Sequence, residues 1–282
     1  MSGGPLVSVE ALAPALARGV VLVDCRFSLA DAGAGERAWR EAHLPGAVHA
    51  DLDRDLSDHR QPAALGRHPL PAAGDFCARL ARWGISPDTE VVAYDAGDGA
   101  MAAARFWWLM RLLGHARVAV LDGGLAAWTA QGLPLESKLP SPAPARYEGA
   151  FDLRQVVGTD EVLARLSGSP GWLVDARAGE RFRGEVEPLD PVAGHIPGAV
   201  NRPYTANLAQ GRFKPAEVLA AEFGELLAGR SPETLVLSCG SGVTACHHAL
   251  AMAQAGLPGA RLYAPSWSGW TSDRGRPVAT GA

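Results

Sequence analysis

Cysteine, surplus positive charge and long apolar runs are all scarce in this sequence. The 282 residues include four cysteines, none in a C-x-x-C pair, so we expect reduced thiols, no disulfide framework and no metal site. With 26 Lys and Arg against 30 Asp and Glu, the chain lacks the basic surplus typical of nucleic-acid binding. No apolar run reaches the roughly 18 residues of a membrane span, and the amino terminus does not resemble a signal peptide. We therefore expect a cytoplasmic protein with no nucleic-acid or membrane partner.

Two short motifs occur once in each half of the chain, in the same order. "LVDCR" at 22–26 returns as "LVDAR" at 173–177, and "HLPGAV" at 43–48 returns as "HIPGAV" at 195–200. A period of roughly 150 residues is far too long for a solenoid, so it indicates two copies of one domain.

The join between the copies is expected where prolines and small residues replace any periodic pattern. This is the stretch "ESKLPSPAPARYEG". The predicted domains are therefore residues 1–135 and 150–282, with a linker at 136–149.

Short apolar runs with β-branched residues predict buried strands in both copies. The runs lie at 20–24, 90–95 and 117–122, and again at 171–175 and 234–239. Apolar stretches predict helices between them, at 102–114 and 247–256. The alternation predicts an α/β fold of two tandem domains, each a mainly parallel sheet flanked by helices. Ligands then belong at the carboxyl ends of the strands.

One predicted strand ends in a cysteine that is surrounded by small residues, in the stretch "SCGSGVTAC". Glycines after Cys239 let the backbone curl, so that N–H groups near the start of the next helix face the sulfur. Such surroundings favour a thiolate, the nucleophilic form of cysteine. The alternative is that Cys239 is a small buried hydrophobe. The matching position in the first copy is Asp95, which predicts that this copy is non-catalytic.

The stretch "CGSGVTA" resembles the active loop of tandem-domain rhodaneses, the thiosulfate and 3-mercaptopyruvate sulfurtransferases. The resemblance implies that Cys239 attacks a small anionic sulfur donor, becomes a persulfide, and passes the sulfur to cyanide or a thiol, thioredoxin among them. It implies no metal and no organic cofactor. The active loop then consists of Gly240, Ser241, Gly242, Val243, Thr244 and Ala245.

Further site residues follow from the same resemblance. Arg181 matches the arginine that holds the donor anion, and Arg183 could share this role. For Arg181 the alternative is an ion pair with a neighbouring acid, Glu180 or Glu185. Ser241, Asp51 and His68 match residues that relay a proton near the donor. Since two of them come from the first copy, the resemblance implies a site built from both copies.

Other repeated residues are expected to be structural, and two positions depart from the family pattern. The pair Asp175 and Arg177 has a counterpart in "LVDCR" of the first copy, and His43 corresponds to His195. Cys246 is expected to pack in the core. Where mercaptopyruvate enzymes follow "EP" with a second arginine, this chain has Leu189. The usual "DGSW" near the carboxyl end is "APSW", and its tryptophan, Trp267, is expected to be structural. The loop favours 3-mercaptopyruvate as donor, whereas the missing arginine favours thiosulfate.

Two other classes of function remain open at this level. Phosphatases with the same fold use a C-x-x-x-x-x-R loop, but the sixth residue after Cys239 is Ala245, so a bound phosphate would lack its closing cation. A non-enzymatic module for sulfur relay or regulation is compatible with the fold. Retention of Cys239 together with Arg181 favours an enzyme.

Overall fold

The computed structural model describes residues 4–100 and 102–281, and these form two compact units. The first unit takes in the chain up to Asp58, then Leu70–Asp152 and Gln210–Phe213. The second takes in His59–Pro69, Leu153–Ala209 and the chain from Lys214 onward. Residues 59–69, which belong to the first sequence repeat, therefore fold as part of the second unit.

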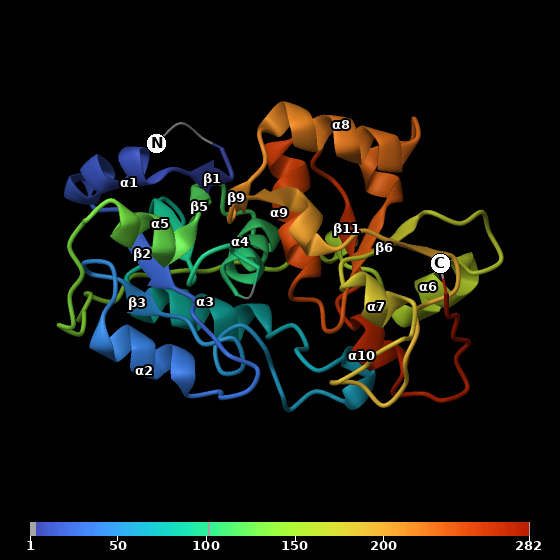
Figure 1. Ribbon diagram of the computed structural model, residues 1–282. Coiled ribbons are helices and arrows are strands. Elements are labelled where there is room, and N and C mark those ends of the chain that lie inside the picture. Colours follow the sequence, from blue (N-terminus) through green and yellow to red (C-terminus); the bar gives the residue numbers. More distant parts are fainter. Residues whose placement is uncertain (1–3, 101, 282) are drawn as a thin grey trace. The chain divides into compact units, whose positions relative to one another are not determined.

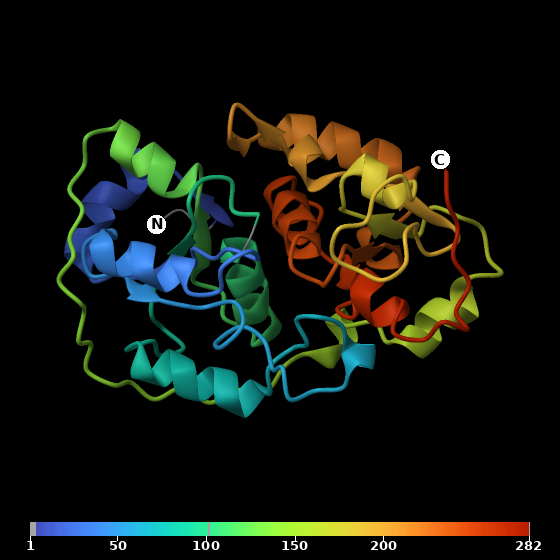
Figure 2. The same cartoon turned by 60° about the horizontal axis from the view of Figure 1, so that its bottom comes forward.

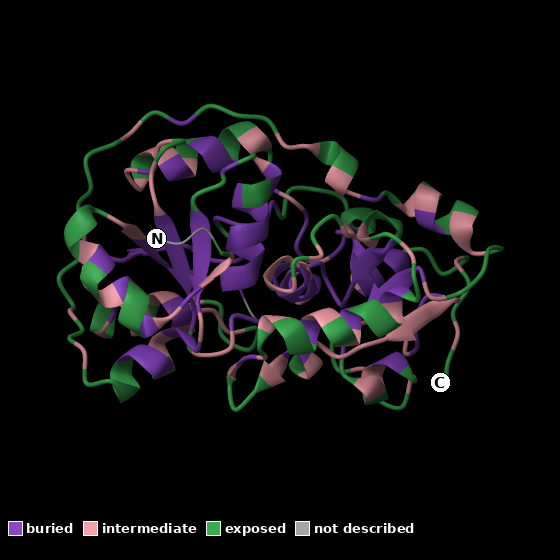
Figure 3. Ribbon diagram, turned by 90° about the horizontal axis from the view of Figure 1, so that it is seen from above, coloured by how far each residue is buried: buried purple, intermediate pink, exposed green. Residues whose placement is uncertain are grey.

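The first unit contains a five-stranded parallel sheet in the order β1-β5-β4-β2-β3. Its strands are β1 (Leu6–Val7), β2 (Val21–Asp24), β3 (Val48–His49), β4 (Val91–Tyr94) and β5 (Val118–Leu121). The β-branched and aromatic side chains of β2, β4 and β5 are almost entirely buried, as Figure 3 shows for the strands. The three strands predicted for this copy are confirmed.

Helices flank this sheet. They are α1 (Val9–Ala15), α2 (Ala34–Glu41), α3 (Ala73–Arg82), α4 (Ala103–Leu112) and α5 (Gly124–Ala130). In α4, nine of the ten residues are buried, which explains why apolar residues occupy nearly all of its faces. Residues 136–149 belong to this unit. Glu136 forms a bridge with His43, and the hydroxyl of the buried Tyr147 lies 3.0 Å from the Nδ1 atom of His115.

The second unit repeats the design with a four-stranded parallel sheet in the order β11-β10-β6-β7. Its strands are β6 (Leu173–Asp175), β7 (Ala199–Asn201), β10 (Val236–Ser238) and β11 (Arg261–Leu262). A further short strand of this unit, β8 (Leu208–Ala209), follows β7 in the chain, whereas β9 (Arg212–Phe213) belongs to the first unit. The register pairs Ser238 with Asp175, so the chain leaves β10 and β6 at the same edge of the sheet. Both strands predicted for this copy are confirmed.

The helices of the second unit are α6 (Thr159–Arg165), α7 (Gly179–Phe182), α8 (Ala216–Leu227), α9 (Ala245–Gln254) and α10 (Ser266–Trp270). The predicted helix after the cysteine loop is α9, and it ends ahead of Gly256, which has φ of 72°. A short turn, Ala63–Leu65, packs against α10, as both Figure 1 and Figure 2 show. Within the described part of the chain, no helix has the length and apolar character that a bilayer crossing requires.

Candidate active site

Cys239 occupies the first position after β10, at the carboxyl edge of the second sheet. Its side chain is buried, and its sulfur accepts a hydrogen bond of 3.1 Å from the amide of Gly242. Gly242 has φ of 75°, and a Cβ there would lie 2.4 Å from the carbonyl oxygen of Ala264. Glycine is required at this position both by the backbone conformation and by the close approach of Ala264. The loop thus curls as predicted and directs an N–H group at the sulfur.

The start of α10 holds the loop from its other side. The amide of Cys239 donates to the hydroxyl of Ser266 at 3.1 Å, and the amides of Trp267 and Ser268 donate to the carbonyls of Cys239 and Gly240. Ser266 adopts φ of 53°, a left-handed conformation that non-glycine residues rarely take. Ser266 was not predicted as a site residue, because nothing in the sequence "APSW" indicates that its hydroxyl reaches the loop.

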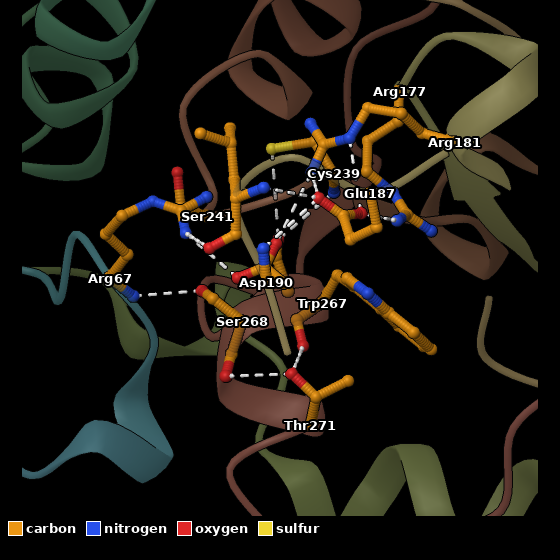
Figure 4. Close-up of polar contacts among 12 residues, drawn as sticks. Arg67, Arg177, Arg181, Glu187, Asp190, Cys239, Ser241, Trp267, Ser268 and Thr271 are labelled. Atoms are coloured by element: carbon orange, nitrogen blue, oxygen red, sulfur yellow. Dashed lines mark hydrogen bonds and ion pairs between the residues drawn. The ribbon is translucent and has the colours of Figure 1, made fainter. Parts of the chain in front are cut away.

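A chain of alternating arginines and carboxylates lies beside the loop (Figure 4). Arg177 bonds to Asp175 and Glu187, and its guanidinium lies over the ring of Trp267. Burial disfavours the charge of Arg177, but the Asp175 and Glu187 carboxylates outweigh this effect and raise the pKa of the guanidinium. Burial likewise disfavours ionised Glu187, yet the hydrogen bond from Arg181 prevails and lowers the pKa of this carboxyl group. These shifts favour the charged forms of Arg177 and Glu187.

Arg181 is mostly buried and lies next to the loop. Its guanidinium bonds to Glu187 at 2.6 Å and to Asp190 at 3.3 Å. Its carboxylate partners are therefore not the sequence neighbours, Glu180 and Glu185, considered as the alternative. A Cβ built on Gly240 would lie 3.6 Å from Nη1 of Arg181, so this guanidinium borders the residue that follows Cys239.

Arg183 is placed differently from Arg181. Its side chain is 43% exposed and forms an ion pair of 2.7 Å with Glu185. The structure thus assigns to Arg183 the kind of surface pairing that had been considered for Arg181.

His68 and Ser241 are brought together. The Nδ1 atom of His68 lies 2.7 Å from the Ser241 hydroxyl, and both side chains are buried. His68 reaches this place through the segment His59–Pro69, which belongs to the second unit. His68 thus lies in the first copy by sequence, while the segment that carries it folds with the second unit.

Asp51 belongs to the first unit. Its carboxylate accepts hydrogen bonds from the amides of Asp53 and Arg54, at 3.0 and 2.8 Å. In the structure this side chain closes a local turn.

The remaining cysteines have surroundings unlike those of Cys239. Burial raises the pKa of the Cys25 and Cys77 thiols, which makes each a poorer source of thiolate. Cys246, on α9, donates from its thiol to the carbonyl of Gly242 at 3.3 Å, so it supports the loop as a packing residue. All four cysteines are free thiols, as predicted. The described side chains include no group of three or more His, Cys, Asp or Glu suited to a metal ion.

Comparison with known proteins identifies the family. Residues 8–131 and 159–273 each match the family described as Rhodanese-like domain. The chain belongs to the rhodanese family. It is 50% identical over its full length to a Pseudomonas aeruginosa protein, also matched in full, described as a "probable 3-mercaptopyruvate sulfurtransferase". It is 40% identical to the human 3-mercaptopyruvate sulfurtransferase, over 95% of this chain and 90% of the human one.

Solved rhodanese structures agree with this assignment. The Escherichia coli 3-mercaptopyruvate enzyme SseA superposes with a TM-score of 0.81 at 32% identity, covering 94% of this chain and 99% of its own. The Leishmania major 3-mercaptopyruvate sulfurtransferase gives a TM-score of 0.83 at 31% identity, covering 96% of this chain and 75% of its own. The protein is a sulfurtransferase with two rhodanese domains, which confirms the predicted fold and class of enzyme.

The two rhodanese copies differ at the position of Cys239, where the first copy has Asp95. In the first copy the carboxylate of Asp95 follows β4, where it accepts hydrogen bonds from the amides of Gly97 and Gly99 at 3.2 and 3.0 Å. An oxygen anion thus takes amide bonds of the kind that the second copy offers to sulfur. The non-catalytic role predicted for the first copy remains a prediction.

Proposed function

We propose that the protein moves sulfane sulfur from 3-mercaptopyruvate to cyanide or a thiol through a persulfide on Cys239. The Cys239 thiolate attacks the donor sulfur and forms an S–S bond. The C–S bond of the donor breaks with its electron pair left on carbon, and the donor's thiol proton is transferred to that carbon, which yields pyruvate. The acceptor then takes the outer sulfur and restores the thiolate.

The donor is chosen on one observation, the 2.7 Å pairing of Ser241 with His68. Removing sulfur from 3-mercaptopyruvate leaves an enolate that must be protonated, whereas sulfite leaves thiosulfate as a stable anion. Ser241 lies two residues after Cys239, and its buried hydroxyl together with the buried imidazole of His68 supplies a proton relay that only 3-mercaptopyruvate needs. The names of the P. aeruginosa and human relatives support the same donor.

The persulfide is anionic, like the thiolate it replaces. The Gly242 amide that donates to the sulfur would continue to stabilise negative charge at this place, in the manner of an oxyanion hole. The fixed loop therefore serves both halves of the reaction cycle.

Thiosulfate is the second candidate donor, because of Leu189. This residue stands where the resemblance calls for a second arginine, and its side chain is 46% exposed. A relative from Mycobacterium tuberculosis, 40% identical over 99% of this chain and 98% of its own, has thiosulfate in its name.

The test is intact-protein mass spectrometry after incubation with each donor. A sulfur adduct of about 32 Da should map to Cys239, disappear in Cys239→Ser, and persist in the matched control Cys25→Ser. The natural protein should favour 3-mercaptopyruvate over thiosulfate in kcat/KM. An adduct on another cysteine would refute the proposed nucleophile, and a preference for thiosulfate would refute the proposed donor.

A further inference from the structure

We infer that Arg67 is a second anion-binding residue, which binds the donor's carboxylate together with Arg181. Arg67 thereby determines donor specificity. This inference rests on the proposed function. Arg67 lies in the segment His59–Pro69 and precedes His68 directly. Nothing in the stretch "GRHPLP" alone indicates a role for Arg67.

Two guanidinium groups converge on the residue after the nucleophile. A Cβ built on Gly240 would lie 3.5 Å from Nη2 of Arg67 and 3.6 Å from Nη1 of Arg181. Because both nitrogens lie within 3.6 Å of one point, they are at most about 7 Å apart, twice that distance. A carboxylate that accepts hydrogen bonds of about 2.9 Å through its two oxygens can bridge such a gap.

One buried carboxylate holds the two guanidinium groups in place. Asp190 accepts from Nη1 of Arg67 at 2.9 Å and from Nη2 of Arg181 at 3.3 Å, and Figure 4 shows the two arginines reaching it from opposite sides. The shared negative charge offsets the repulsion between the two cations. Asp190 bonds to Nη1 of Arg67, whereas Nη2 of Arg67 and both Nη atoms of Arg181 lie within 3.7 Å of the Cβ position built on Gly240. The Nε atom of Arg67 is also buried, and it has no hydrogen-bond partner among the described residues.

The backbone of Arg67 is fixed as firmly as its side chain. Its amide donates to the Ser268 hydroxyl at 2.9 Å, while the Ser268 amide donates to the Gly240 carbonyl at 2.9 Å. The preceding residue, Gly66, has φ of 91°, and a Cβ there would lie 2.5 Å from the carbonyl oxygen of Pro265. Ser268 of α10 therefore holds both the Arg67 backbone and the Cys239 loop, which is the preorganisation expected of a binding residue.

This placement explains how the site functions with Leu189 at the position after "EP". Leu189 precedes Asp190, and its carbonyl accepts a long bond of 3.5 Å from Nη1 of Arg67. The cation missing from this stretch is thus supplied to the same place by a different segment of the chain. Arg67 is a specificity-determining residue, with no part in bond making or breaking.

A pair of alkylating reagents tests the inference without turnover. Iodoacetate carries a carboxylate and iodoacetamide is its neutral analogue, and both alkylate a cysteine thiolate with loss of iodide. In Arg67→Gln, the rate constant for iodoacetate at Cys239 should fall about 10- to 100-fold, as expected for loss of one charge-assisted hydrogen bond, while that for iodoacetamide stays within about twofold. Equal falls for both reagents would indicate collapse of the loop, and no fall for either would remove the anion-binding role; each result overturns the inference.

Steady-state kinetics give the second measurement. Arg67→Gln should raise KM for 3-mercaptopyruvate about 10- to 100-fold. Transfer of sulfur from preformed Cys239 persulfide to cyanide should keep its rate. The matched control is Arg37→Gln, because Arg37 is an exposed arginine of the first unit paired with Asp31, and its kinetics should equal those of the natural protein.

A variant of Gly240 tests the same space from the other side. The Cβ of Gly240→Ala would meet both guanidinium groups at 3.5 to 3.7 Å, which is ordinary contact, and Gly240 is not among the positive-φ glycines. The variant should therefore fold normally, yet occupy the space intended for the donor anion and raise KM as Arg67→Gln does. An unchanged KM in a folded Gly240→Ala would contradict the inference. Failure of either donor to label Cys239 in the natural protein would instead defeat the proposed function.

Discussion

The hydroxyl of Ser241 and the imidazole of His68 lie 2.7 Å apart, although 173 positions separate them in the chain. Proton transfer through this pair should assist the reaction with 3-mercaptopyruvate and not the reaction with thiosulfate. In Ser241→Ala and in His68→Asn, pyruvate formation from 3-mercaptopyruvate should fall about 10²- to 10⁴-fold, the usual range for general acid–base catalysis. Labelling of Cys239 by thiosulfate should change far less.

Single-turnover measurements with each donor distinguish proton transfer by this pair from structural support of the loop. Equal losses with both donors would show that the pair supports the loop and transfers no proton. A loss in Ser241→Ala alone would exclude His68 from the relay.

Gly242 and Gly256 provide a matched pair for the loop conformation. Both have positive φ, 75° and 72°, but a Cβ would clash with Ala264 at position 242 and meet nothing within 4 Å at position 256. Gly256→Ala should lower the free energy of unfolding by about 1–2 kcal/mol, the cost of a left-handed alanine. Gly242→Ala should cost more and should abolish labelling of Cys239. Equal losses of stability, measured by urea unfolding, would show that contact with Ala264 is unimportant.

His248 should make stability depend on pH. Burial, and then the nearby charge of Arg202, lower the pKa of this imidazole to about 3, while its ring accepts a hydrogen bond from Asn207 at 2.9 Å. In the unfolded chain the imidazole has its usual pKa of 6.5 and binds a proton below that pH, whereas in the folded chain it does not until pH nears 3. The stability from this group is therefore complete above pH 6.5 and is lost as pH falls towards 3.

The measurement is urea unfolding at pH 7.5 and pH 5. Replacing His248 with Gln should shrink the difference in unfolding free energy between these two pH values by about 2 kcal/mol, at 1.36 kcal/mol per pH unit. An unchanged difference would mean that His248 titrates alike in the folded and unfolded chains.

The second sequence copy should not work by itself. A fragment of residues 150–282 carries Cys239 and Arg181 but lacks the segment that supplies Arg67 and His68. We expect it to form little persulfide from 3-mercaptopyruvate, and we expect activity to return when residues 1–149 are added as a separate chain. Full activity of the fragment alone would show that residues 59–69 are dispensable.

The sequence was most informative where the signal is local. The strands β2, β4, β5, β6 and β10 were recognisable because each lies in an apolar run of five or six residues. The strands β3 and β7 each follow a Pro-Gly turn and lie in no such run, so they are defined by their partners across the sheet. The Cys239 loop could be located because its glycines follow a strand directly.

The rest of the site depends on contacts that sequence spacing does not reveal. The partners expected for Arg181 were its nearest acids, yet Glu187 and Asp190 reach it because the chain after α7 turns back. Arg67 directly precedes His68, but its place at the site could not be predicted, because nothing in "GRHPLP" indicates that this segment packs on α10. Tertiary packing, which joins residues far apart in the chain, decided these positions.

The hydrogen bond between the Arg67 amide and the Ser268 hydroxyl can form only after both residues have been synthesised. Arg67 leaves the ribosome 201 residues before its partner does. At a translation rate of about 5–20 residues per second, that interval lasts about 10–40 s. Throughout it, residues 59–69 have no α10 to pack against, and Cys239 emerges only near its end. We therefore expect a nascent chain to lack this support between Arg67 and the Cys239 loop until translation has passed Ser268.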